Sequence, residues 1–220
     1  MKTPRIFVNA AHHLRDSGVI SGPLKENVLG VEMPLNLGMM VRDNLRPLLE
    51  GYEVFYVPDE LDLKASIAWI NERAKLEDFA LEVHFNSNND TTIRGTEAYY
   101  TDNPQFAIFF SKEISEKLEI PNRGAKHDSQ TYVGSLGFLR KLACPSVVVE
   151  AAYLTNYQDR WIISQLDAPR KIAEGVVNAI KLLFPLPKKP EPETPSWFRS
   201  FLLSLVSFLN NYLKLGGFRK

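Results

Sequence analysis

Short hydrophobic runs alternate with segments of helical periodicity along most of this chain. Runs rich in β-branched and aromatic residues predict buried strands at 5–9, 53–57, 79–85, 96–100 and 146–150. Spacing of the kind seen for Leu37, Val41 and Leu45 predicts helices at about 34–49, 62–76, 106–118 and 170–184, with a short helix or turn over 133–141. Strands that alternate with helices indicate an α/β fold with a single, largely parallel, twisted sheet flanked by helices.

The pattern changes at residue 185. Five prolines fall between residues 185 and 195, which is typical of a stiff, extended linker. Beyond it, residues 197–215 have the apolar spacing of an amphipathic helix, with Ser200, Ser204 and Ser207 on a narrow polar stripe. We therefore expect a domain at 1–184, a Pro-rich linker at 185–195 and a C-terminal amphipathic helix within 196–220.

Composition and charge narrow the functional classes. The chain is 45% hydrophobic and 24% charged, as expected for a packed domain, and its net charge of zero gives no support for nucleic acid as a partner. Its single cysteine, Cys144, excludes an internal disulfide and is best explained as a small core residue.

The first residues, Met1 to Arg5, lead directly into a strand without an apolar segment typical of a secretory signal. We therefore expect a protein that stays in the cytoplasm until it is released to its site of action.

Four residues with acid–base or metal-binding chemistry lie at strand ends or at the start of the next helix: His12, Glu32, His84 and Glu150. In open α/β sheets ligands bind at the carboxyl ends of the strands. Two histidines and a carboxylate suit catalytic zinc, which keeps a fourth position for water. A further carboxylate is needed for proton transfer, and Glu150 fits this role. The metalloprotease motif H-E-x-x-H is absent from the sequence.

Six motifs then follow in a fixed order. They are Ala11-His12 with Asp16-Ser17-Gly18-Val19; Glu32 with Asn36, Leu37 and Gly51; His84-Phe85-Asn86; Gly95-Thr96-Glu97-Ala98-Tyr99-Tyr100; Asn122-Arg123-Gly124, read as a turn; and Pro145 with Glu150, Thr155, Asn156 and Asp159. From about residue 5 to residue 184, this order resembles the type-3 family of zinc-dependent N-acetylmuramoyl-L-alanine amidases, which includes phage endolysin domains.

The resemblance implies that His12, Glu32 and His84 hold Zn²⁺ and that Glu150 is the catalytic acid/base. The substrate would be peptidoglycan, cut between the lactyl group of N-acetylmuramic acid and L-alanine in cell-wall lysis or remodelling. Asn86 and Glu82 are our candidate substrate-binding residues. For Glu82, a contact to a metal ligand and an ordinary surface carboxylate are the alternatives.

The sequence departs from the family pattern in ways that leave alternatives open. Ala11 and His13 replace the glycines that usually flank the first histidine, so His13 competes with His12 as a ligand. Glu26 lies at the commoner distance from that histidine, although the helix register favours Glu32.

Two other functions compete with the amidase. One is a non-catalytic peptidoglycan- or membrane-binding protein on the same scaffold, and the other is a different zinc peptidase or deacetylase. For the C-terminal helix we expect a membrane surface as partner, with self-association as the alternative. The sequence does not distinguish a phage from a cellular origin.

Overall fold

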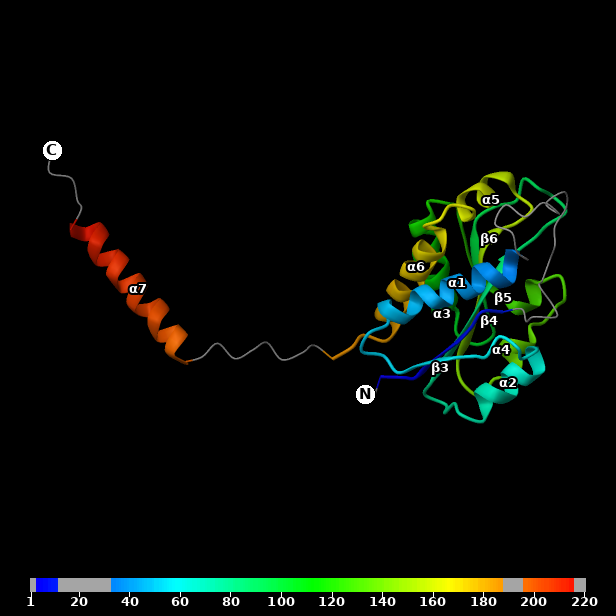
Figure 1. Cartoon of the computed structure of the whole chain (residues 1–220), viewed down its shortest axis with the longest axis horizontal. Coiled ribbons are helices and arrows are strands. Elements are labelled where there is room, and N and C mark those ends of the chain that lie inside the picture. The colour runs from blue at the N-terminus through cyan, green and yellow to red at the C-terminus, as the bar shows by residue number, and fades with distance from the viewer. Residues whose placement is uncertain (1–2, 12–32, 188–195, 216–220) are drawn as a thin grey trace. The chain divides into compact units, whose positions relative to one another are not determined.

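The computed structural model describes residues 3–11, 33–187 and 196–215 (Figure 1). The strands are β1 (Ile6–Asn9), β2 (Val54–Tyr56), β3 (Phe79–Asn86), β4 (Thr96–Tyr100), β5 (Asn122–His127) and β6 (Ser146–Tyr153). The helices are α1 (Met33–Leu48), α2 (Leu63–Asn71), α3 (Pro104–Leu118), α4 (Gly137–Lys141), α5 (Tyr157–Ile163), α6 (Ala168–Leu183) and α7 (Ser196–Leu215). Contacts divide the chain into two compact units, Met1–Leu186 and Pro187–Lys220.

The six strands form one sheet in the order β2-β1-β3-β6-β4-β5. All neighbouring strands are parallel except β4 and β6, which pair antiparallel. The prediction of an α/β fold with a largely parallel sheet is therefore confirmed.

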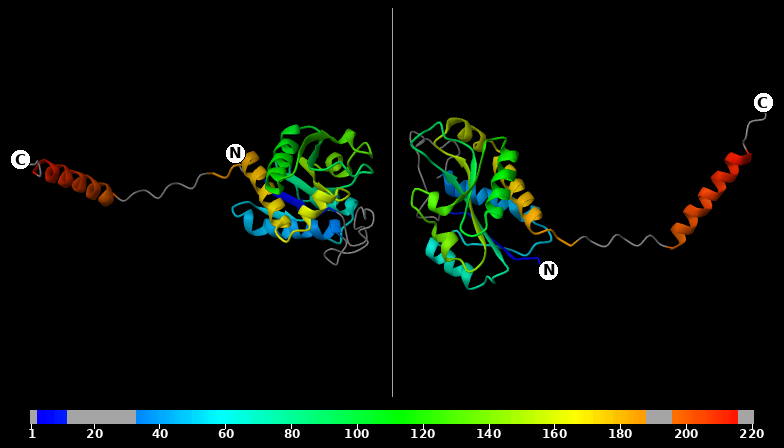
Figure 2. Two further views of the ribbon diagram at one scale, coloured as in Figure 1. Left: turned by 90° about the horizontal axis from the view of Figure 1, so that it is seen from above. Right: turned by 180° about the vertical axis from the view of Figure 1, so that it is seen from behind.

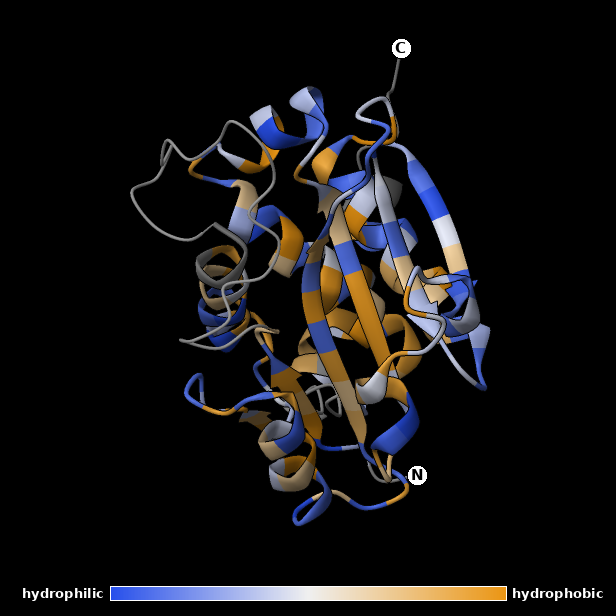
Figure 3. Ribbon diagram, turned by 90° about the vertical axis from the view of Figure 1, so that its right-hand side faces the viewer, coloured by the Kyte–Doolittle hydropathy of each residue, from blue (hydrophilic) through white to orange (hydrophobic). Residues whose placement is uncertain are grey.

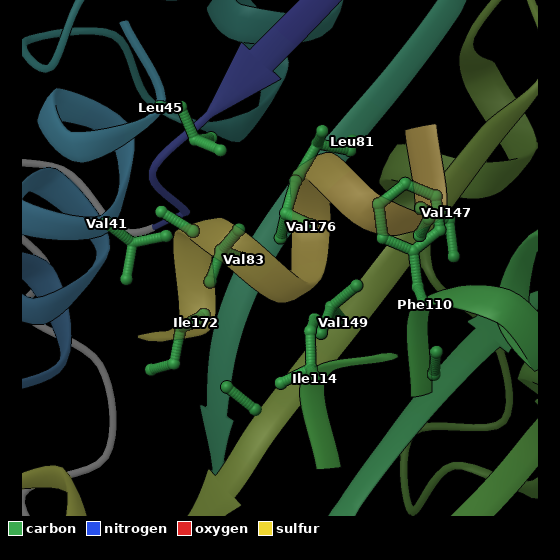
Figure 4. Packing of buried hydrophobic residues seen from close by; sticks show 14 of the residues in the cluster. Val41, Leu45, Leu81, Val83, Phe110, Ile114, Val147, Val149, Ile172 and Val176 are labelled. Carbon is green, nitrogen blue, oxygen red and sulfur yellow. The ribbon is translucent and has the colours of Figure 1, made fainter. Parts of the chain in front are cut away.

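Helices α1, α3 and α6 cover one face of the sheet, as Figure 2 shows from two sides. The apolar positions of β3 and β6 that point to this face pack against all three helices. The side chains labelled in Figure 4 are Val41, Leu45, Leu81, Val83, Phe110, Ile114, Val147, Val149, Ile172 and Val176. Burial of these side chains is the main stabilising contribution to the domain.

The opposite face of the sheet has a smaller apolar cluster. Phe7, Ala80 and Val148 from the strands pack there with Phe138 of α4 and Ile70 of α2. Toward the carboxyl end of β3, the residues on this face change from apolar to polar, and the long central strands in Figure 3 show polar positions interrupting hydrophobic ones. The polar positions on this face form the candidate site.

One local prediction was wrong. Residues 122–124 are not a turn but the start of edge strand β5, which pairs with β4 and ends at His127. β5 lacks alternating apolar residues, and two of its side chains, Arg123 and Lys126, bind the Glu97 carboxylate of β4, so periodicity gave no strand signal. The short helix or turn predicted over 133–141 is confirmed, since a turn at 132–133 precedes the short helix α4.

The C-terminal helix predicted at 197–215 is confirmed as α7. No helix in the described part of the chain has the length and hydropathy needed to cross a membrane.

Candidate active site

Strand register brings three chemically active side chains into one row across the sheet. His84 of β3 pairs with Glu150 of β6, and Glu150 pairs in turn with Glu97 of β4. Residues paired in register project from the same face of a sheet. A second row lies two residues earlier on β3, where Glu82 pairs with Asn9 of β1.

Glu82 links the two rows. Its Oε2 lies 2.9 Å from Nε2 of His84, and its Oε1 accepts a hydrogen bond of 2.8 Å from Nδ2 of Asn9. A carboxylate at Nε2 favours the tautomer in which the proton is on Nε2 and the lone pair on Nδ1. Pairs of this kind orient metal-binding histidines and raise the basicity of the ring.

Glu150 is partly buried, and its Oε2 is enclosed without a hydrogen-bond partner among the described residues. Burial raises the pKa of the Glu150 carboxyl to about 7. The negative charges of Glu97 and Glu82 act in the same direction, whereas His84 opposes them. A carboxyl that titrates near neutral pH can accept and return a proton, as a general acid/base must.

Glu97, the neighbour of Glu150, has the opposite environment. Its Oε1 accepts hydrogen bonds from Tyr99 Oη at 2.6 Å and Asn86 Nδ2 at 2.9 Å. Its Oε2 accepts from Arg123 Nε at 2.7 Å and from Lys126 Nζ. Burial alone would raise the pKa of Glu97, but these donors hold it below its usual range. Glu97 is thus a fixed negative charge beside Glu150.

A cavity of about 530 Å³ opens over His84 and Glu150. Its polar lining includes Asn9, Glu82, His84 and Glu150, and α2 and α4 supply apolar and basic residues. A pocket that combines apolar walls with a few convergent polar groups and a perturbed carboxyl is the expected form of an active site.

The structure brings some of the predicted site residues together, while others lie outside its description. His84, Glu82 and Glu150 all line the cavity. Asn86 is engaged with Glu97. His12 and Glu32, with the competing His13 and Glu26, lie in residues 12–32, outside the described residues.

Within the described ranges, no three His, Cys, Asp or Glu side chains are grouped to hold a metal. The observations that suit a metal are the oriented imidazole of His84 and the enclosed Oε2 of Glu150.

Sequence reasoning missed the roles of Glu97 and Asn9. The motif Gly95-Thr96-Glu97 contained a signal, because an acidic residue inside a buried strand requires partners. Those partners come from β3, β4 and β5, which are brought together only by the pairing of distant strands.

Fold and site together define an α/β protein with a histidine and a carboxylate of raised pKa on neighbouring central strands of the sheet. A family model described as N-acetylmuramoyl-L-alanine amidase matches residues 6–182. The chain therefore belongs to this family, the type-3 amidases that the sequence resembles.

One relative in sequence and two solved structures are similar to this chain. N-acetylmuramoyl-L-alanine amidase LytC of Bacillus subtilis (strain 168) is 28% identical over 176 residues, a match that covers 78% of this chain and 34% of LytC. The catalytic domain of CwlV from Bacillus (Paenibacillus) polymyxa var. colistinus superposes with a TM-score of 0.67 at 21% identity, covering 82% of this chain and 97% of that domain. N-acetylmuramoyl-L-alanine amidase AmiC2 of Nostoc punctiforme superposes with a TM-score of 0.68 at 21% identity, and the match covers 82% of this chain and 96% of the AmiC2 chain. These two structures share the fold.

Proposed function

We propose that the protein is a zinc-dependent hydrolase that cuts the amide bond between N-acetylmuramic acid and L-alanine in peptidoglycan. The observation that carries this proposal is Glu150: a carboxyl with a pKa of about 7, next in register to His84, in the cavity of a chain that belongs to this amidase family.

His84 would be one zinc ligand, with Glu82 as the carboxylate that orients its ring. His12 and Glu32 would complete the set, as the family resemblance implies. When bound, zinc would polarise the scissile carbonyl and lower the pKa of a water molecule to roughly 7.

Glu150 would take the proton from the attacking water and deliver it to the leaving nitrogen of L-alanine. Proton transfer by a positioned side chain of this kind contributes roughly 10²–10⁴-fold to the rate. Glu97 keeps a negative charge beside Glu150 and so keeps the pKa of that carboxyl high enough to hold the proton between the two steps.

The metal part of this proposal is tested by zinc analysis of purified protein. We expect about one zinc per chain in the wild type and in Glu150→Gln, loss of zinc in His84→Ala, and loss of wall hydrolysis on chelation. Glu50→Gln, an exposed carboxylate outside the cavity, is the matched control and should behave as wild type. Protein that binds the wall but contains no zinc would favour the non-catalytic alternative.

For the C-terminal helix we propose contact with an anionic membrane surface. Phe201, Leu205 and Leu209 recur at four-residue spacing on α7 and are exposed by 55%, 42% and 48%. Residues 196–220 include four basic and no acidic residues. An apolar helical face in a basic segment suits the boundary between headgroups and acyl chains. With this tail, the protein would remain in the cytoplasm until release to the wall, in contact with the membrane.

The tail proposal is tested by cosedimentation of the whole protein with vesicles. Binding to phosphatidylglycerol-containing vesicles should exceed binding to pure phosphatidylcholine, and Leu205→Glu should abolish it, whereas the neighbouring Ser204→Glu should weaken it only slightly. Vesicle-independent dimers that are lost in Leu205→Glu would support self-association instead.

A further inference from the structure

The cavity continues beyond the row of His84 and Glu150 toward α2 and α4, and the described contacts fix the geometry of these two helices. At one end, Asn71 of α2 donates to the Lys141 carbonyl and accepts from the Ala143 amide, both at 2.8 Å. At the other end, a Cβ on Gly137 would lie 3.5 Å from Cδ2 of Leu63. The amino ends of the two helices therefore lie together, and so do their carboxyl ends.

Two lysines from these helices line the cavity. Lys64 lies in the first turn of α2 and Lys141 is the last residue of α4, and both are exposed. Neither ammonium group has a carboxylate partner among the residues that the structure describes. Two acidic side chains of the cavity are otherwise engaged: Asp62 caps α2 through Ala65 N, and Glu82 binds Asn9 and His84.

Apolar side chains also line the cavity. They are Leu61, Leu63, Ile67, Leu136 and Phe138. A ligand that fits this lining combines a small apolar group with a negative charge. The leaving group of the proposed reaction has this form, because L-alanine is followed by residues with carboxylates.

Lys64 therefore lies at one end of this helix pair and Lys141 at the other. Resting on the proposed function, we propose that the cavity wall that bears these two lysines forms a subsite for a carboxylate of the peptidoglycan stem peptide. The subsite lies on the leaving-group side of the scissile amide. It makes the enzyme selective for stem peptides whose carboxylate is free over those in which it is amidated.

The test compares soluble muropeptides that differ in a single group. One pair has the α-carboxyl of the second residue, D-glutamate, either free or amidated. A second pair has the side-chain carboxyl of diaminopimelate, the third residue, either free or amidated. Each pair is assayed for kcat and KM with wild type, Lys64→Gln, Lys141→Gln and the double variant. Lys75→Gln removes an exposed lysine outside the cavity and controls for net charge.

In one of the two muropeptide pairs, we expect the KM of the wild type to be about three- to tenfold lower for the substrate with the free carboxylate than for the amidated substrate. The double variant should lose most of this difference by raising KM for the charged substrate alone, with kcat unchanged, and Lys75→Gln should retain it. The pair that responds identifies which carboxylate is bound. Equal effects on charged and amidated substrates, or none in either pair, would overturn the subsite.

The same muropeptides titrated calorimetrically into these variants give dissociation constants without turnover. If the wild type releases no stem peptide from any substrate, the proposed function fails. The calorimetric difference between charged and amidated ligands still decides the subsite, which is refuted if the dissociation constants of each pair agree.

Discussion

Glu97 and Glu150 are paired across adjacent strands, yet their surroundings separate their protonation. Two cations and two neutral donors hold Glu97 ionised, whereas burial without such donors raises the pKa of Glu150. Carboxylates whose pKa values are driven apart are a common sign of divided roles in an active site. In the proposed mechanism Glu97 is the fixed charge and Glu150 transfers the proton.

This pairing predicts how Glu97→Gln changes the pH dependence. The negative charge of Glu97 raises the pKa of Glu150, so its removal, which also leaves Arg123 and Lys126 without that partner, should lower it. The acid limb of the pH profile of kcat/KM should therefore move to lower pH in this variant. Tyr99→Phe keeps the charge of Glu97 and should leave the limb close to that of wild type. A limb that stays in place or moves upward in Glu97→Gln would contradict this coupling.

Ala11 holds a conformation that suits glycine. Its φ is 63°, it is buried, and it lines the cavity at the end of β1. For an L-residue this left-handed region costs roughly 1–2 kcal/mol, while glycine loses more chain entropy on folding. Ala11→Gly should therefore raise the free energy of unfolding by about 0.5–1 kcal/mol in urea titrations. The matched change Ala10→Gly, without a positive φ, should lower it, and stabilisation by both variants would contradict this explanation.

At the level of secondary structure, the close packing of α3 on α6 depends on Gly175. A Cβ at this position would lie 2.7 Å from Cα of Ile114 and 2.9 Å from the Glu113 carbonyl oxygen. Both are backbone atoms, so the helices must move apart to admit a methyl group. Gly175→Ala should lower the free energy of unfolding by about 1–3 kcal/mol, although alanine favours helix.

Gly137→Ala is the matched control for that change. Its added Cβ would make an ordinary contact with Leu63, and the residue is at the start of α4. Thermal unfolding of this variant should match wild type or occur at a slightly higher temperature. Equal destabilisation by the two substitutions would show that helix packing is not the cause.

Secondary structure could be predicted where burial dominates. β1, β3 and β6 are apolar enough to show as strands, and their carboxyl ends correctly suggested that His84 and Glu150 lie together. β5 and the role of Glu97 could not be predicted in this way. They depend on antiparallel pairing of β4 with β6 and on cations from an edge strand, and local periodicity does not encode either.

At the scale of the whole molecule, the compact unit Met1–Leu186 includes the end of α6. The Phe184 carbonyl accepts a hydrogen bond of 2.8 Å from Tyr52, and its ring lies 5.1 Å from that of Phe79. A fragment of residues 1–186 should therefore unfold at the temperature of the full chain. A fragment of residues 1–178, which removes Phe184, should unfold at a clearly lower temperature in calorimetry. If residues 1–186 were equally destabilised, the tail would be part of the folded domain.

The most direct test is mass spectrometry of purified peptidoglycan after digestion. The wild type should release stem peptides with a new amino-terminal L-alanine and leave glycan strands with intact N-acetylmuramic acid. Glu150→Gln, folded and still loaded with zinc, should release at least about 100-fold less. Cleavage within the glycan or the peptide, or undiminished release by Glu150→Gln, would contradict the assignment of this protein as an amidase that uses Glu150 as its acid/base.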